Sequence, residues 1–115
     1  MSLLLLALLL PARAETLELE LLRPDGRSFS MKRVEQPQDG QQIVFPDGNR
    51  AWSARLHRRD YDGRLELCAD LSAWNPDGEE EPETSSCVVL IGRESPEASI
   101  VIKGRRIQVR MTARR

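Results

Sequence analysis

The chain has 115 residues, with 17 Lys and Arg against 18 Asp and Glu, and a formal net charge of −1. This length allows one small domain, and it excludes multidomain enzymes and nucleotide-binding α/β folds of ordinary size.

The N-terminus has the pattern of a secretory signal peptide. Leu3–Leu10 is an unbroken apolar run, too short to cross a membrane as a helix, which needs about 20 residues. Pro11 ends the run, and Ala12 and Ala14 are the small residues that a signal peptidase requires. No Lys or Arg precedes the run, which departs from the usual pattern. We therefore predict cleavage after Ala14 and a periplasmic or secreted protein, with no membrane insertion after cleavage.

The remaining residues have the pattern of short β-strands. Apolar and polar side chains alternate with a period of two, and turn sequences interrupt them about every ten residues. Pro-Asp-Gly occurs at Pro24, Pro46 and Pro76, and this composition suits tight turns. The predicted strands are, in chain order, Thr16–Arg23, Ser28–Val34, Gln41–Phe45, Arg50–Arg58, Arg64–Leu71, Ser86–Ile91, Ile100–Lys103 and Arg106–Ala113.

No helical periodicity follows the leader, so the fold is predicted to be all-β. Seven to eight short strands indicate a single small antiparallel β-sandwich of immunoglobulin-like size, with a small β-barrel as the alternative. In this interpretation residues 1–14 are the cleaved signal peptide, and residues 15–115 form the single domain.

Cys68 and Cys87 are the only cysteines. In an oxidising compartment an even number of cysteines indicates a structural disulfide. If the bridge joins two adjacent antiparallel strands, Cys68 lies opposite Cys87 and Leu71 lies opposite Thr84. The connection between these strands would then be a long loop from Ser72 to Glu83.

The sequence contains no convincing catalytic or metal-binding pattern. His57, the only histidine, is expected on the surface near Asp60 and Asp62. A G-x-S-x-G motif is absent, and neither Asp60–Glu66 nor Asn75–Glu81 has the spacing of a calcium loop. We therefore expect no enzyme activity, no cofactor and no metal.

Basic residues are concentrated at the C-terminus. Lys103–Arg115 holds six bases and no acid. The domain is acidic overall and poor in aromatic residues for base stacking, so no nucleic-acid partner is expected. The bases instead predict a charged last strand that protects a sheet edge.

The segment Trp74–Glu83 is the best candidate for a binding site. It combines a large apolar side chain, a turn and a run of carboxylates, which are the features of an anchor surrounded by steering charge. Alternatively, Trp74 caps the core and the acids keep the tip soluble. The candidate partner-binding residues are Trp74, Asp77, Glu79, Glu80 and Glu81.

Two functions follow from these patterns. The first is a non-enzymatic exported β-sandwich that binds another protein with a basic surface, as an accessory subunit, inhibitor or immunity-type factor. The second is a structural or assembly module of an envelope complex, whose C-terminal strand pairs with another chain at a sheet edge.

Overall fold

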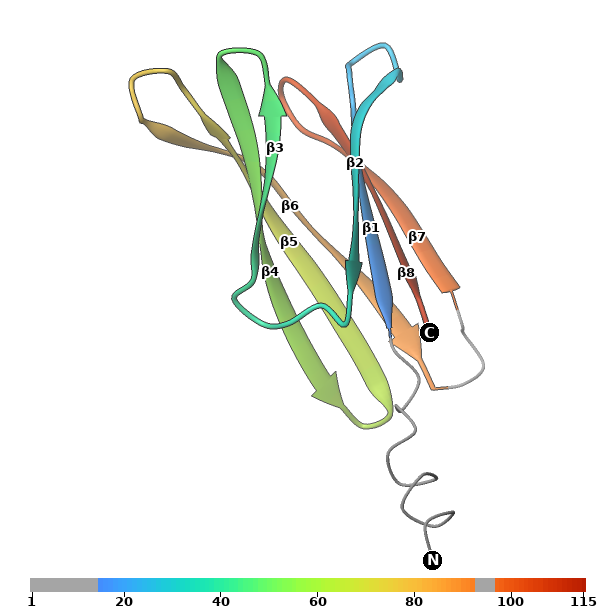
Figure 1. The fold of residues 1–115 in the computed structure, drawn as a ribbon. Helices are drawn as coiled ribbons and strands as arrows, with labels where there is room; N and C mark the ends of the chain where they lie inside the picture. Colours follow the sequence, from blue (N-terminus) through green and yellow to red (C-terminus); the bar gives the residue numbers. More distant parts are fainter. Residues whose placement is uncertain (1–14, 93–96) are drawn as a thin grey trace, which may run out of the picture.

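The computed structural model describes residues 15–92 and 97–115 and shows the all-β fold that the sequence predicts. These residues form eight strands in two antiparallel four-stranded sheets, consistent with a sandwich (Figure 1). One sheet has the order β2-β1-β8-β7 and the other β3-β4-β5-β6. The strands are β1 (Thr16–Leu22), β2 (Ser28–Glu35), β3 (Gln42–Asp47), β4 (Arg50–Tyr61), β5 (Arg64–Trp74), β6 (Glu80–Ile91), β7 (Glu97–Lys103) and β8 (Gln108–Arg114).

The predicted signal peptide, residues 1–14, lies outside the described residues, as do residues 93–96 of the loop between β6 and β7. In the part of the chain that is described, no helix has the length and apolar character needed to span a membrane.

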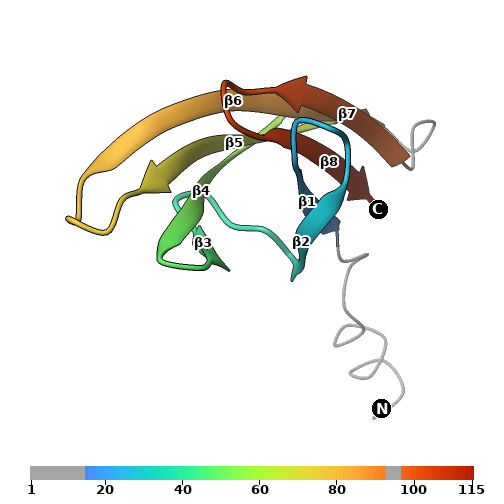
Figure 2. The same ribbon diagram turned by 90° about the horizontal axis from the view of Figure 1, so that it is seen from above.

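The core lies between the two sheets, which Figure 2 shows as two layers. Alternate residues of each strand point inward, as the period-two pattern requires. Leu17, Leu19 and Leu21 of β1 are 0–1% exposed, and they belong to the same core cluster as Phe45 and Trp52 of the facing sheet. Burying each such side chain stabilises the fold by roughly 1.5–3 kcal/mol.

Four of the turns lie at one end of the sandwich, at the top of Figure 1: β1–β2, β3–β4, β5–β6 and β7–β8. The β4–β5 turn lies at the opposite end and consists of Asp62 and Gly63, both with positive φ (47° and 73°). Two left-handed residues in a two-residue loop match the twist of a β-hairpin.

The disulfide and its register follow the prediction. Cys68 and Cys87 are bonded, with Cα atoms 4.0 Å apart, and they are direct partners on β5 and β6. Leu71 faces Thr84, as expected. The bridge lies on the outer face of the sheet, while Leu67 and the other inward-facing residues of β5 are buried.

The prediction of a long loop from Ser72 to Glu83 is wrong. β5 continues to Trp74 and β6 begins at Glu80, with a register shift after Leu71 that lets the two strands stay paired. A bulge of this kind bends a ladder without ending it. The connection is therefore only the five residues from Asn75 to Glu79.

The prediction that the last strand protects an edge is also wrong. β8 lies between β1 and β7, and its arginines neutralise acids of β1. Arg110 pairs with Glu20 at 2.6 Å, and Arg114 pairs with Glu18 at 2.5 Å. Opposite charges on neighbouring strands stabilise the pairing. The C-terminal strand consequently has no free edge for an assembly partner.

Replacing Cys68 and Cys87 together by Ser is expected to lower the free energy of unfolding by about 3 kcal/mol, because the open chain gains entropy in the unfolded state. Urea denaturation measures the change. A reducing agent should lower the denaturation midpoint of the wild-type protein and leave that of the variant unchanged. Equal midpoints for the oxidised wild type and the variant would contradict the prediction.

Candidate functional site

The tip of the β5–β6 hairpin is a tightly closed turn. The backbone N–H of Gly78 donates to the carbonyl of Asn75, and the N–H of Asn75 donates to the carbonyl of Glu79, both at 2.9 Å. Asp77 accepts a further bond from the N–H of Glu79 at 2.9 Å. Gly78 has φ +89°, a conformation that favours glycine. The acidic tip is thus held by its own hydrogen bonds.

Trp74 is not a free anchor. It is the last residue of β5, it is half-buried, and its indole Nε1 donates to Ser53 Oγ on β4 at 2.7 Å. The ring is therefore held against the outer face of the neighbouring strand, on the side opposite the core residues Trp52 and Ala73. Trp74 thus neither caps the core nor projects as a free anchor.

The predicted acidic residues divide into two groups. Glu81 accepts a hydrogen bond from the amide of Asn75 at 2.9 Å and lies 3.4 Å from Nη2 of Arg106. Asp77, Glu79 and Glu80 are exposed, and no ion pair involves them among the residues that the structure describes. The tip therefore carries three carboxylates without a neutralising base.

Glu83 is the important residue that the sequence did not single out. Its side chain is 0% exposed, and it accepts hydrogen bonds from the backbone N–H of Arg106 at 2.5 Å and from Arg106 Nε at 3.0 Å. Burial by itself raises the pKa of this carboxyl, but the bonds from Arg106 outweigh burial and hold the pKa below its ordinary value. Nothing local distinguishes Glu83 from its acidic neighbours, because its partner is 23 residues away.

Arg106 belongs to the β7–β8 turn, so its bonds to Glu83 on β6 join the two sheets. Its guanidinium also lies 5.4 Å from the centre of the Trp52 ring, whose Nε1 donates to Asp47 at 3.0 Å. Asp47 in turn accepts two bonds from Arg23, at 2.9 and 3.0 Å, which together with the Trp52 bond lower its pKa. We call Arg23, Asp47, Trp52, Glu83 and Arg106 the inter-sheet cluster.

A groove of about 420 Å³ lies on the outer face of the β3-β4-β5-β6 sheet at the base of the hairpin. Its surface is about equally polar and apolar, and it includes one guanidinium, that of Arg55. Its lining residues include Gln42, Ser53, Arg55, Asp70, Ser72 and Glu80. Glu80 belongs both to this groove and to the acidic end of the hairpin.

His57 is on the surface, as expected, but its close acidic partner is neither Asp60 nor Asp62. Its Nε2 lies 2.7 Å from Asp70 on the next strand, and Asp70 also accepts a bond from Ser85 Oγ at 2.7 Å. The Ser85 bond, with a contribution from His57, holds the pKa of Asp70 below its ordinary value despite partial burial. The carboxylate stands between the hydroxyl and the imidazole, so His57 does not contact Ser85 as a general base would.

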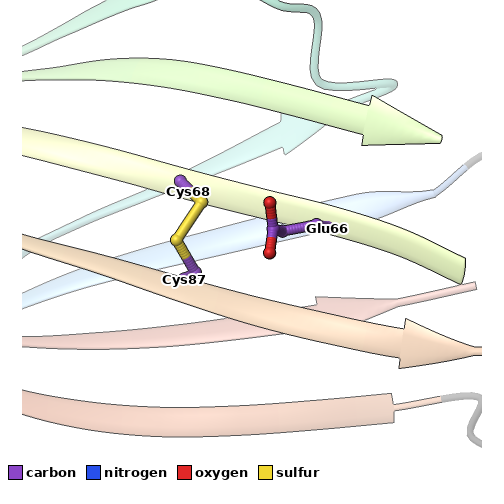
Figure 3. Close-up of side chains that lie close together, drawn as sticks. All are labelled: Glu66, Cys68 and Cys87. Carbon is purple, nitrogen blue, oxygen red and sulfur yellow. A yellow bond between two sulfur atoms is a disulfide. The ribbon is translucent and has the colours of Figure 1, made fainter. Parts of the chain in front are cut away.

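Glu66 lies beside the disulfide (Figure 3). Its carboxylate and the sulfurs of Cys68 and Cys87 are within 4.8 Å of one another, the one such group among residues 15–92 and 97–115. Metal ligation by cysteine requires thiolates, and the disulfide occupies both sulfurs. In the oxidised protein this group therefore lacks the ligands of a metal centre.

No protein-family model, curated protein or solved structure that was compared with the chain matches it. The structure therefore defines the class of protein only by its fold. It is a disulfide-bonded all-β domain of two sheets, with an acidic hairpin whose tip is held by hydrogen bonds.

Replacing Glu83 by Gln tests the charge at the centre of the inter-sheet cluster. Because hydrogen bonds to a charged group contribute about 1.5–3 kcal/mol, we expect a loss of stability of this order at neutral pH. The lowered pKa means that Glu83 stabilises the folded state fully above its ordinary pKa, about 4.3, and that this contribution is lost as the pH falls through the folded-state pKa.

The free energy of unfolding of the Glu83→Gln variant should therefore decrease less steeply below about pH 4.3 than that of the wild type. Asp47 and Asp70 also have lowered pKa values, so part of the slope should remain. Urea titrations at several pH values measure the slope. Parallel pH profiles for the two proteins would contradict the assignment.

Gly104, in the β7–β8 turn, permits the close approach of Glu83. A Cβ at this position would lie 2.6 Å from Glu83 Oε2 and 2.8 Å from its Cγ. Gly104→Ala should therefore destabilise the fold by about 1–3 kcal/mol. The same substitution in a Glu83→Ala background should cost less, because the clashing atoms are gone. Equal costs in the two backgrounds would show that the side chain of Glu83 is not the obstacle.

Proposed function

We propose that the chain is a non-enzymatic exported β-sandwich that binds another protein with a basic surface through the tip of the β5–β6 hairpin. The observation that carries the proposal is the uncompensated negative charge of Asp77, Glu79 and Glu80 on a braced hairpin. An accessory subunit, an inhibitor and an immunity-type factor are all roles of this kind.

The bracing favours binding because it fixes the tip before a partner arrives. Three hydrogen bonds hold the hairpin at successive positions along its length: Trp74 to Ser53, Asn75 to Glu81, and Arg106 to Glu83. A surface that is already ordered loses less conformational entropy on association. Concentrated charge of one sign also accelerates encounter with an oppositely charged partner.

The groove on the outer face extends this surface. Glu80 lines it together with Asp70, while Gln42, Ser53 and Ser72 supply hydrogen-bonding groups. Asp70 already accepts bonds from Ser85 and His57 and lies opposite Arg55, so Glu80 is the groove carboxylate that a Lys or Arg of the partner would meet. The contact region is thus the tip and the adjacent groove, with Trp74 as a support.

Two observations support the proposal that the protein is exported from the cytoplasm. The leader has the pattern of a signal peptide, and the Cys68–Cys87 disulfide is compatible with an oxidising compartment outside the cytoplasm.

Replacing Glu79 and Glu80 together by Gln removes two charges and leaves the turn bonds of Asp77 in place. We expect partner binding to weaken roughly tenfold at low salt, chiefly through slower association. Affinity capture from the extracytoplasmic fraction of the source cells identifies the partner, and titration of that partner measures the effect.

The matched control is Asp62→Asn with Glu66→Gln, which removes the same charge near the β4–β5 turn at the opposite end. Under the proposal this control binds like the wild type. Equal binding by the tip variant and the wild type would reject the tip as the contact.

A further inference from the structure

β7 is an edge strand without the features that usually prevent pairing with another chain. Figure 1 shows it at the outer edge of its sheet, and Ile100 and Val101 are 37% and 46% exposed. Its central residues, Ala98 to Ile102, include no charge and no proline. Two of the other edge strands carry such residues along their length: Lys32 and Arg33 on β2, and Pro46 on β3. On β6 the charges and the proline are confined to residues 80–83, so what distinguishes β7 is the pair of opposite charges at its two ends.

The β7–β8 turn determines which backbone groups of β7 point outward. The N–H of Gly104 donates to the carbonyl of Ile107 at 2.8 Å, and the ladder continues from Lys103 opposite Gln108. Hydrogen-bonded and non-hydrogen-bonded pairs alternate along an antiparallel ladder. Ile100 therefore bonds towards β8, whereas Ser99 and Val101 direct their N–H and C=O groups to the free edge.

The ends of β7 complement each other in charge. In a two-fold symmetric antiparallel pair centred on Ile100, Glu97 of one copy lies opposite Lys103 of the other, at both ends. Ser99 then lies opposite Val101 of the second copy, with the outward backbone groups of both in register. Lys103 has no ion pair among the described residues, and the side chain of Glu97 is 55% exposed although it also contacts Arg114.

From these observations we propose that β7 pairs with β7 of a second copy of this chain. The two four-stranded sheets join into one continuous eight-stranded sheet with Ile100 opposite Ile100 at the two-fold axis. The interface is isologous, so the dimer is closed and no edge of β7 remains for further growth. This contact is independent of the hairpin tip, which belongs to the other sheet.

Analytical ultracentrifugation of the protein purified from cells expressing the full chain, over a dilution series, tests the proposal. The wild type should show a monomer–dimer equilibrium. Lys103→Glu places like charges opposite each other at both ends and should weaken dimerisation roughly tenfold. A monomer at every concentration, larger assemblies, or a dimer that Lys103→Glu does not affect would overturn the proposal.

Exchanging the charges at positions 97 and 103 between two variants distinguishes the proposed strand register from a general effect of net charge on association. Glu97→Lys should also weaken the homodimer, whereas a mixture of the Glu97→Lys and Lys103→Glu proteins restores an opposite pair at each end. The mixture should therefore form a heterodimer about as tightly as the wild type forms its homodimer. Failure of the mixture to associate would exclude this pairing.

An engineered cysteine tests the register without altering charge. In the proposed pair the Cα atoms of the two Ile100 residues are about 4.5 Å apart, which suits a disulfide. Ile100→Cys should therefore form a cross-linked dimer on mild oxidation. The control, Ile102→Cys, lies opposite Ala98 of the other copy and should not cross-link. Equal cross-linking of both variants would reject the register.

Discussion

The placement of the hairpin depends on the contact between Glu83 and Arg106. Packing of the apolar faces holds the two sheets together, but it is not directional and fixes their relative position only loosely. A buried carboxylate that accepts bonds from both the backbone and the guanidinium of one arginine has a far narrower geometry. Gly104 leaves room for this approach. The pair thus fixes β6 against the β7–β8 turn and determines where the hairpin projects.

The same contact explains how one short segment can hold so many acids. Arg106 neutralises Glu83 and lies near Glu81, so the carboxylates closest to the core do not repel one another without compensation. The negative charge that remains is carried by Asp77, Glu79 and Glu80, where water screens it. The acidic run therefore divides in two: its inner members join the sheets, and its outer members carry the exposed charge on which the proposed binding of a basic partner rests.

Local patterns predicted a large part of this structure. Alternation, a continuous apolar run at Ser86–Ile91 and the turn sequences located the eight strands, and the two cysteines together with antiparallel pairing gave the register of β5 and β6. One error is local: the loop predicted from Ser72 to Glu83 is mostly paired strand, because a register shift after Leu71 lets the hairpin continue. The other errors concern contacts between distant segments. The pairing of β1 with β8, which joins Glu18 to Arg114, spans 96 positions and leaves no local trace in the sequence. For the same reason His57 could not be matched with Asp70, nor Glu83 with Arg106.

The absence of charged residues from the centre of β7, an edge strand, needs an explanation. In a monomer, a neutral strand rich in β-branched residues at a sheet edge invites uncontrolled pairing and aggregation. Charge on β2 and proline on β3 oppose such pairing, and on β6 such residues are confined to the end next to the hairpin tip. On β7 the charges stand only at the two ends, where they select an antiparallel partner in one register. In a closed dimer the β7 edges of both copies are paired with each other. The acidic tip of each copy belongs to the other sheet, so it would remain available to bind a different protein.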